Sequence, residues 1–203
     1  MVDYSRKKIQ DYAMSYWNKD GLHVGTKMYE EYLKMFEIDG DFSGKTVVDI
    51  GCGAFGGMLS VIKAEKKIGI DPMAKIFHEK LRIPLKDMVI LPEFAEETTL
   101  ENGLADLIFC CNTLDHVIEP EKVVKQIYRL LKKDGLFFLH VHMRTKAQLN
   151  IGHEFAFTEE LIDAWFKDLK LIKKQIFSVD PVTSTVLKKY KTHYRTYIGV
   201  FQK

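Results

Sequence analysis

The stretch VVDIGCGAFGG, residues 47–57, decides the fold of this chain. An apolar run typical of a buried strand passes directly into a glycine-rich turn. Glycine permits the left-handed backbone of a tight turn and lets a ligand approach the main chain closely. The stretch therefore predicts a ligand-binding turn between a buried strand and a helix.

Two interpretations of this turn compete. The pattern G-x-G-x-x-G over residues 51–56 is that of a dinucleotide site, and Asp71 follows Gly51 by 20 residues, where it would hold a ribose. Asp49 argues against a dinucleotide, because the pyrophosphate would lie over the turn and a nearby carboxylate would repel it. S-adenosylmethionine carries an ammonium, a sulfonium and no phosphate, so Asp49 favours that cofactor.

Outward from the turn, short apolar runs alternate with helical patterns. The clearest helix begins at Pro120, carries apolar residues at helical spacing and is closed by Gly135. Thr158 is expected to cap another helix that runs to about Lys167. This alternation favours an α/β fold with a mainly parallel sheet wrapped by helices. The expected strands are residues 45–50, 66–71, 87–91, 105–111, 135–142, 169–177 and 193–202, the last two as a hairpin-like pair.

A single domain is expected over residues 1–203, because this length suits one core of the usual size of roughly 100–200 residues. With 46% apolar and 29% charged residues, the chain is neither disordered nor of low complexity. Residues 1–42 contain two amphipathic helical patterns, which we expect to form an N-terminal lid over a core of residues 45–203. These helical patterns contain Tyr12, Trp17 and His23, and packing against the sheet explains each of these side chains at least as well as a place beside a substrate.

Three features predict a cytoplasmic protein without a membrane partner. The apolar runs are too short to span a bilayer. The N-terminal residues lack the apolar segment of a secretion signal. The three cysteines, with Cys110 and Cys111 adjacent, do not suit a disulfide framework.

The charges are unevenly distributed although the net charge is only +2. Residues 170–203 carry eight lysines and arginines against one acid, Asp180. The favoured interpretation of this bias is a solvated strand pair with basic flanks, and the alternative is an anionic substrate or a nucleic acid.

The sequence resembles class I S-adenosylmethionine-dependent methyltransferases. Residues 47–57 and IGIDP (68–72) look like motifs I and II of that family. Residues 104–142 look like the fourth strand, helix and fifth strand of its small-molecule "type 11" branch, and residues 152–166 are similar to the segment that follows. The resemblance covers about 160 residues from Lys45 onward. It implies a Rossmann-like fold with a central seven-stranded, mostly parallel sheet, an antiparallel last strand and helices on both faces.

The resemblance also implies which residues hold the cofactor. The glycine turn would shape the methionine pocket, and the residues after the fourth strand would contact the methionine portion from the other side. Asp71 would accept both ribose hydroxyls, although the same residue could only cap the following helix. The residues placed at S-adenosylmethionine are Asp49, Gly51, Cys52, Gly53, Asp71, Pro72, Met73, Glu96, Asn112 and Leu114.

The chain departs from the family pattern at two positions. Phe55 stands where the family usually has glycine, which would reshape the turn and place the ring against cofactor or substrate. Phe94 stands where an aspartate commonly binds the adenine amine, so backbone groups and packing would hold the adenine instead.

Histidines that follow the fourth and fifth strands are the candidates for catalysis, because open α/β sheets bind ligands at the carboxyl ends of their strands. His116, beside Asp115, is the first choice for a general base, since the loop after the fourth strand faces the methyl group in the resembling family. His153 is the second choice. His140 and His142 could form a metal site with His153 or Glu154, but core histidines without a metal are the favoured interpretation.

The sequence thus predicts a methyltransferase that uses S-adenosylmethionine to O-methylate a small polar metabolite such as a sugar. The alternatives are a nucleic-acid methyltransferase, an NAD-dependent oxidoreductase and a non-catalytic cofactor-binding domain. Nucleic acid is disfavoured, because the fourth strand ends in NTLD (112–115) without the Asn/Asp-Pro-Pro-aromatic motif of amino-group base methylases. The sequence leaves the oligomeric state open.

Overall fold

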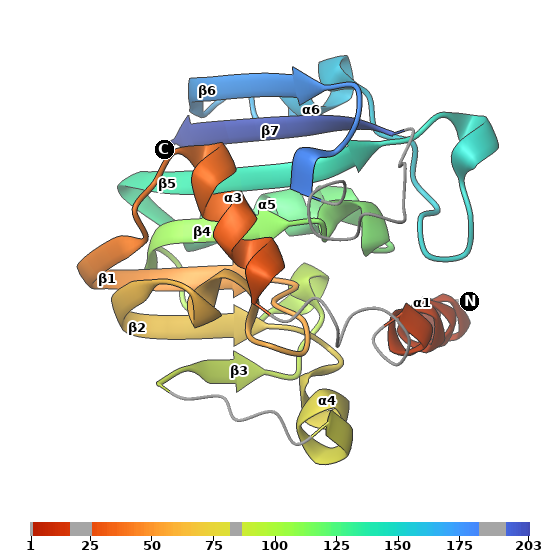
Figure 1. Cartoon of the computed structure of the whole chain (residues 1–203), viewed down its shortest axis with the longest axis horizontal. Helices are drawn as coiled ribbons and strands as arrows, with labels where there is room; N and C mark the ends of the chain where they lie inside the picture. Colours follow the sequence, from red (N-terminus) through yellow and green to blue (C-terminus); the bar gives the residue numbers. More distant parts are fainter. Residues whose placement is uncertain (1, 17–25, 82–86, 183–193) are drawn as a thin grey trace.

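The computed structural model describes residues 2–16, 26–81, 87–182 and 194–203. These residues contain a seven-stranded sheet in the order β3-β2-β1-β4-β5-β7-β6 (Figure 1). β7 runs antiparallel to both of its neighbours, and the other adjacent strands are parallel. The predicted sheet is therefore confirmed. Its strands are β1 (Asp41–Ile50), β2 (Lys63–Ile70), β3 (Val89–Leu91), β4 (Ala105–Cys111), β5 (Leu131–Met143), β6 (Lys170–Phe177) and β7 (Arg195–Gln202).

Helices cover both faces of the sheet, as expected. On one face, Val123 and Ile127 of α5 and Ile162 of α6 are completely buried in the core. On the other face, Phe36 of α3 packs edge-on against Phe138 of β5, with ring centroids 5.2 Å apart. The helices are α1 (Val2–Tyr16), α3 (Lys27–Phe36), α4 (Ala74–Leu81), α5 (Pro120–Leu130) and α6 (Glu159–Trp165), with short 3₁₀ turns η2 (Gly57–Ser60), η3 (Ala95–Glu97), η4 (Leu114–His116) and η5 (Lys146–Gln148).

Two expected helix boundaries are wrong. The glycine turn leads only into the single turn η2, because Gly56 and Gly57 have φ of 79° and 59°, which an α-helix cannot accommodate. The helix that begins at Pro120 ends at Leu130, since Leu131 is already extended and pairs with Ala105 of β4.

Other observed boundaries lie closer to those predicted from the sequence. The hydroxyl of Thr158 caps α6 by accepting a hydrogen bond from the Leu161 N–H at 3.2 Å, as predicted. β1 begins at Asp41, so residues 41–42 of the expected lid belong to the sheet. The division of the chain into a lid and a core stays a prediction.

Helix α1 lies beyond the carboxyl ends of the parallel strands (Figure 1). Arg6 of α1 donates a 2.6 Å hydrogen bond to Glu97, and its guanidinium lies 4.2 Å from the centroid of the Phe94 ring. Farther along α1, the Tyr12 ring packs against Gly152, where a Cβ atom would come within 2.2 Å of it. Trp17 and His23 lie outside the described residues. Among the helices that the structure describes, none is long and apolar enough to cross a membrane.

Candidate functional site

A cavity of about 480 Å³ opens at the carboxyl ends of the parallel strands. Its walls come from the turns that follow β1, β2, β4 and β5 and from helices α1 and α3. The predicted site residues in its lining are Gly51, Gly53, Asp71, Pro72, Met73, Glu96, Asn112, His116 and His153.

Four other predicted residues are buried and are not part of that lining. Asp49 accepts a 2.6 Å hydrogen bond from the Met58 N–H, so it fixes the start of η2, and burial raises the pKa of its carboxyl. Cys52 packs its sulfur against Gly69, where a Cβ atom would lie 2.6 Å away. Leu114 belongs to the apolar core, and Asp115 lies behind the histidines. These four residues therefore support the residues that line the cavity and are not themselves part of the lining.

The glycine turn is tied to the ends of β2 and β4. Gly51 has a φ of 73°, and a Cβ atom there would lie 2.1 Å from the Thr113 side chain, so only glycine fits. The Asp71 carboxylate accepts hydrogen bonds of 2.8 Å from the N–H groups of Gly53 and Met73. Burial raises the pKa of Asp71, while these two N–H groups favour its ionised form. Asp71 therefore both caps the segment before α4 and orders the turn.

Asn112 lines the cavity and has a buried acceptor without a partner among the described residues. It has a φ of 53°, and its buried Oδ1 atom has no hydrogen-bond partner among the described residues. A buried acceptor without a partner costs about 1–3 kcal/mol, so this atom fits a ligand that brings a donor. The adjoining wall is apolar at Pro72, Met73 and Phe94.

The remaining cofactor candidates have partners within the protein. Glu96 accepts hydrogen bonds from the N–H groups of Ile118 and Glu119 at 3.2 and 3.5 Å, which holds the chain before α5. Phe55 packs with Ala54, Met73 and the neighbouring apolar side chains and is not in the described lining of the cavity. The expectation that Phe55 faces the cofactor or substrate stays a prediction.

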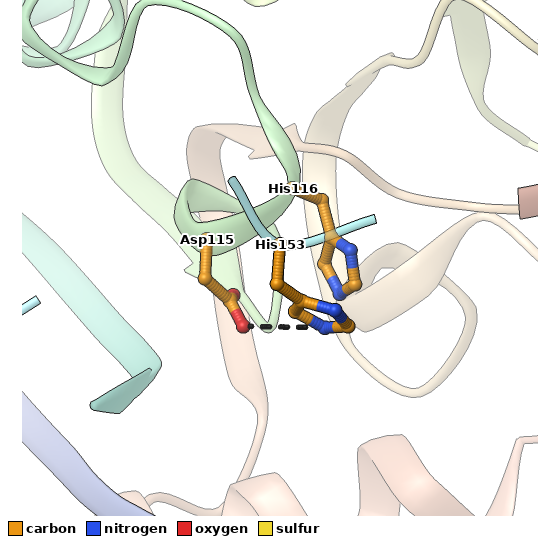
Figure 2. A group of neighbouring side chains, drawn as sticks. All are labelled: Asp115, His116 and His153. Carbon is orange, nitrogen blue, oxygen red and sulfur yellow. Dashed lines mark ion pairs between the residues drawn. The ribbon is translucent and has the colours of Figure 1, made fainter. Parts of the chain in front are cut away.

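Three candidates for catalysis gather at the other end of the cavity. Asp115 and His116 belong to η4, and His153 reaches them from the loop after η5 (Figure 2). The Asp115 carboxylate lies 3.7 Å from Nε2 of His153 and 3.6 Å from Nδ1 of His142. Burial opposes ionisation of Asp115, but His116 and His142 hold the pKa of its carboxyl well below the usual range.

Hydrogen bonds orient both rings of this group. Nδ1 of His116 lies 2.8 Å from the Gly152 carbonyl oxygen, which only accepts, so this nitrogen carries the proton. In the neutral ring the lone pair is then on Nε2. Burial lowers the pKa of His116, which keeps it neutral near pH 7. Nδ1 of His153 lies 2.9 Å from Oδ1 of Asn150, and burial together with His116 lowers the pKa of His153 to about 3.

A second buried group lies behind the first. Asp180, from the loop after β6, lies 3.3 Å from Nε2 of His140 and 3.1 Å from Nε2 of His142. Burial opposes the charged form of His142, but Asp115 and Asp180 outweigh it and raise its pKa to about 9. The contacts between these side chains therefore form a row in which acidic and basic groups alternate, in the order Asp180, His142, Asp115 and His153.

The metal site considered from the sequence has different members in the structure. Asp180, and neither His153 nor Glu154, joins His140 and His142, while His153 joins Asp115 and His116. In each of these two groups the candidate ligand atoms lie within 4.8 Å of one another, a spacing that a metal ion could bridge. The structure holds both groups together as histidine–carboxylate pairs.

The pKa of His142 gives a testable dependence of stability on pH. Because the folded state raises this pKa from 6.5 to about 9, the stabilisation is complete below pH 6.5 and is lost as the pH rises through 9. The shift corresponds to about 3 kcal/mol. We expect urea unfolding to show a lower free energy of unfolding at pH 9.5 than at pH 6.5. The variant His142→Gln should reduce this difference, and an equal pH dependence in both proteins would contradict the assignment.

Sequence reasoning missed two polar residues of this region. Arg144 lines the cavity, and its signal was present, because residues 140, 142 and 144 alternate along and just beyond β5 and share one face of the strand. Asp180 carried no such signal, since it lies about 40 residues from its histidine partners. The segment that contains it, residues 170–203, stands out in the sequence only for its excess of basic residues.

Comparisons with known proteins agree on one class. The family described as "Methyltransferase domain" matches residues 22–179. A ubiquinone biosynthesis O-methyltransferase of Coxiella burnetii is 31% identical over 74% of this chain and 68% of its own length. The enzyme of the same name from Salmonella paratyphi A is 26% identical over 99% of this chain and 88% of its own length.

Solved structures show the same fold. A SAM-dependent methyltransferase from Thermotoga maritima superposes with a TM-score of 0.64 at 18% identity, over 97% of this chain and 99% of that one. Phosphoethanolamine N-methyltransferase 2 of Haemonchus contortus, in complex with S-adenosyl-L-methionine, gives a TM-score of 0.65 at 14% identity, over 93% of this chain and 59% of that one.

Proposed function

Since this chain belongs to the class I S-adenosylmethionine-dependent methyltransferases, we propose that it methylates a hydroxyl oxygen of a small aromatic molecule. The observation that carries the proposal is the fixed tautomer of His116, whose Nε2 lone pair suits the removal of a hydroxyl proton. The names of the relatives in Coxiella and Salmonella support oxygen as the acceptor atom. Tyr12, Tyr29 and Tyr32 line the same cavity and would pack against a flat ring.

The sugar acceptor predicted from the sequence has no support from the relatives, and family membership overturns the oxidoreductase and the non-catalytic domain. Nucleic acid stays an alternative for the test below. The cytoplasmic location and the single-domain organisation also stay predictions.

The cavity residues fit the cofactor of the family. The free acceptor on Asn112 suits its ammonium, and the Asp71 carboxylate suits its ribose hydroxyls. The apolar wall of Pro72, Met73 and Phe94 suits its adenine. When bound, S-adenosylmethionine supplies a methyl group on a positively charged sulfur, which needs no further activation.

The protein would then contribute alignment and proton removal. His116 accepts the proton of the acceptor hydroxyl at Nε2 as the oxygen becomes nucleophilic. The Gly152 carbonyl keeps the ring oriented through Nδ1, and the negative charge of Asp115 stabilises the imidazolium that forms. After the product leaves, the proton passes from Nε2 to water.

Release of S-adenosylhomocysteine with different acceptors tests this proposal. Catechol, glucose, histamine and a single-stranded oligonucleotide represent a phenol, a sugar, an amine and a nucleic acid. We expect turnover with catechol and not with the other three. Turnover confined to glucose, histamine or the oligonucleotide would contradict the proposal.

Replacing Asp71 should weaken the cofactor site. Asp71→Ala removes charge-assisted hydrogen bonds, so the affinity for S-adenosylhomocysteine should fall by about 1–3 kcal/mol in a calorimetric titration. Asp71→Asn keeps the size of the side chain and removes its charge, so it separates the effect of the charge on affinity from the effect of packing. Glu101→Ala, which changes an exposed residue, is the control. Unchanged affinity in Asp71→Ala would mean that Asp71 serves only the turn.

A further inference from the structure

We propose that Arg144 binds a carboxylate of the acceptor, so that the preferred substrates are hydroxylated aromatic acids. This inference rests on the proposed function, because it concerns the acceptor end of the same cavity. It adds a specificity-determining residue that neither the sequence analysis nor the comparisons assign.

Arg144 is a buried cation that makes no ion pair with any acid that the structure describes. It lies just beyond β5, is 6% exposed and lines the cavity. Its Nε and Nη1 atoms are buried and have no hydrogen-bond partner within residues 2–16, 26–81, 87–182 and 194–203. The two buried carboxylates of this region face histidines and form no ion pair with Arg144: Asp115 lies 3.6 Å from His142 and 3.7 Å from His153, and Asp180 lies 3.3 Å from His140 and 3.1 Å from His142. A buried charge is costly unless it is paired, which points to a ligand as the source of the missing anion.

The guanidinium is held in position for a planar anion. Its central carbon lies 3.7 Å from the centroid of the Tyr194 ring, so that ring covers one face of the group. Covering a face leaves the edge, where the N–H groups lie, for hydrogen bonds. A carboxylate matches an edge of this group with two parallel hydrogen bonds, accepted from Nη2 together with either Nε or Nη1, which a hydroxyl or an amide cannot do.

Arg144 also acts on the groups proposed for catalysis. Besides burial, its positive charge lowers the pKa of both His116 and His153. It likewise opposes the rise that burial gives to the pKa of Tyr12. The cation therefore stands close enough to the proposed base for one small molecule to offer a hydroxyl to His116 and a carboxylate to Arg144.

The basic residues 170–203 do not supply this anion site where the structure describes them. Lys173 pairs with Glu37 at 2.8 Å, and Lys174 pairs with Asp163 at 2.7 Å. Arg195 lies 3.5 Å from Glu159. These pairs agree with the interpretation of that segment as a solvated strand pair, while residues 183–193 lie outside the described part.

The test compares an acid with its neutral counterpart. Calorimetry measures the binding of 3,4-dihydroxybenzoate and of 3,4-dihydroxybenzamide to the full chain saturated with S-adenosylhomocysteine. We expect the acid to bind about 10- to 100-fold more tightly than the amide, the scale for a charge-assisted pair. Arg144→Gln should abolish this preference without changing the affinity for S-adenosylhomocysteine. Arg144→Lys keeps the positive charge but loses the planar guanidinium, so it should retain part of the preference for the acid over the amide.

Lys146→Gln is the matched control, because Lys146 is an exposed cation two residues away and outside the cavity lining. It should keep the full preference for the acid. Equal binding of acid and amide by the native protein, absence of binding by both, or a preference that survives in Arg144→Gln would each overturn the inference. If Arg144→Gln does not fold, the native comparison and Arg144→Lys decide. An Arg144-dependent preference without methyl transfer to either compound would support this inference and refute the proposed function.

Discussion

Replacing His116 by alanine should slow methyl transfer by about 10²–10⁴-fold, the usual contribution of a general base. Binding of S-adenosylhomocysteine should stay unchanged, because His116 makes its hydrogen bond to the Gly152 carbonyl at the acceptor end of the cavity. The measurement is single-turnover transfer to catechol, combined with a calorimetric titration of the cofactor product.

The matched variant is His153→Ala, which removes the neighbouring imidazole whose ring centroid lies 4.2 Å from that of His116. We expect a smaller loss of rate, since His153 has its Nδ1 next to Asn150 and a pKa of about 3. The native rate should also fall in acid, because the base must be neutral, and the fall should lie below pH 6.5, since burial lowers the pKa of His116 from the ordinary histidine value. If the rate falls only in His153→Ala, the base is His153 and the assignment of His116 is wrong.

Replacing Asp180 by alanine should destabilise the folded protein by about 3–5 kcal/mol, the cost of breaking a buried ion pair by removing one partner. Asp180 is completely buried and is the carboxylate between His140 and His142. His142 forms ion pairs with Asp180 and Asp115, so the variant leaves it only the pair with Asp115 among the described residues. Urea unfolding at pH 6.5 measures the loss.

The loss should be smaller at pH 9.5 than at pH 6.5, because His142 is neutral at the higher pH in the native protein as well. Glu101→Ala, which removes an exposed carboxylate, should change the free energy of unfolding by less than about 0.5 kcal/mol. A stability of Asp180→Ala equal to that of Glu101→Ala would show that the buried pairs contribute nothing.

Local patterns account for what the sequence predicted well. The strand and glycine turn at residues 47–57 are specified by apolar run length and by glycine, which needs no knowledge of distant residues. The same holds for the cap at Thr158, where the hydroxyl bonds an N–H three residues on. The seven strands follow from runs bounded by turn residues, and their order follows from the family that these motifs resemble.

Long-range contacts account for what the sequence did not predict. Asp49 has its hydrogen bond with Met58 at the start of η2, so its carboxylate orders the protein and does not line the cavity. Asp180 joins the histidines of β5 only because the chain returns to the sheet after β6. Neither partnership leaves a periodic trace in the sequence. Arg144 did leave one, since its alternation with His140 and His142 predicts a shared face.

The measurement that tests this account most directly is the identity of the bond formed. The full chain is incubated with S-adenosylmethionine labelled with ¹³C in its methyl group and with 3,4-dihydroxybenzoate, and the product is examined by ¹³C NMR. We predict a labelled methyl carbon with the chemical shift of an aromatic methyl ether, which forms far more slowly when His116→Ala replaces the native chain. A label on ring carbon, or no labelled product from this acid or from catechol, would contradict the account.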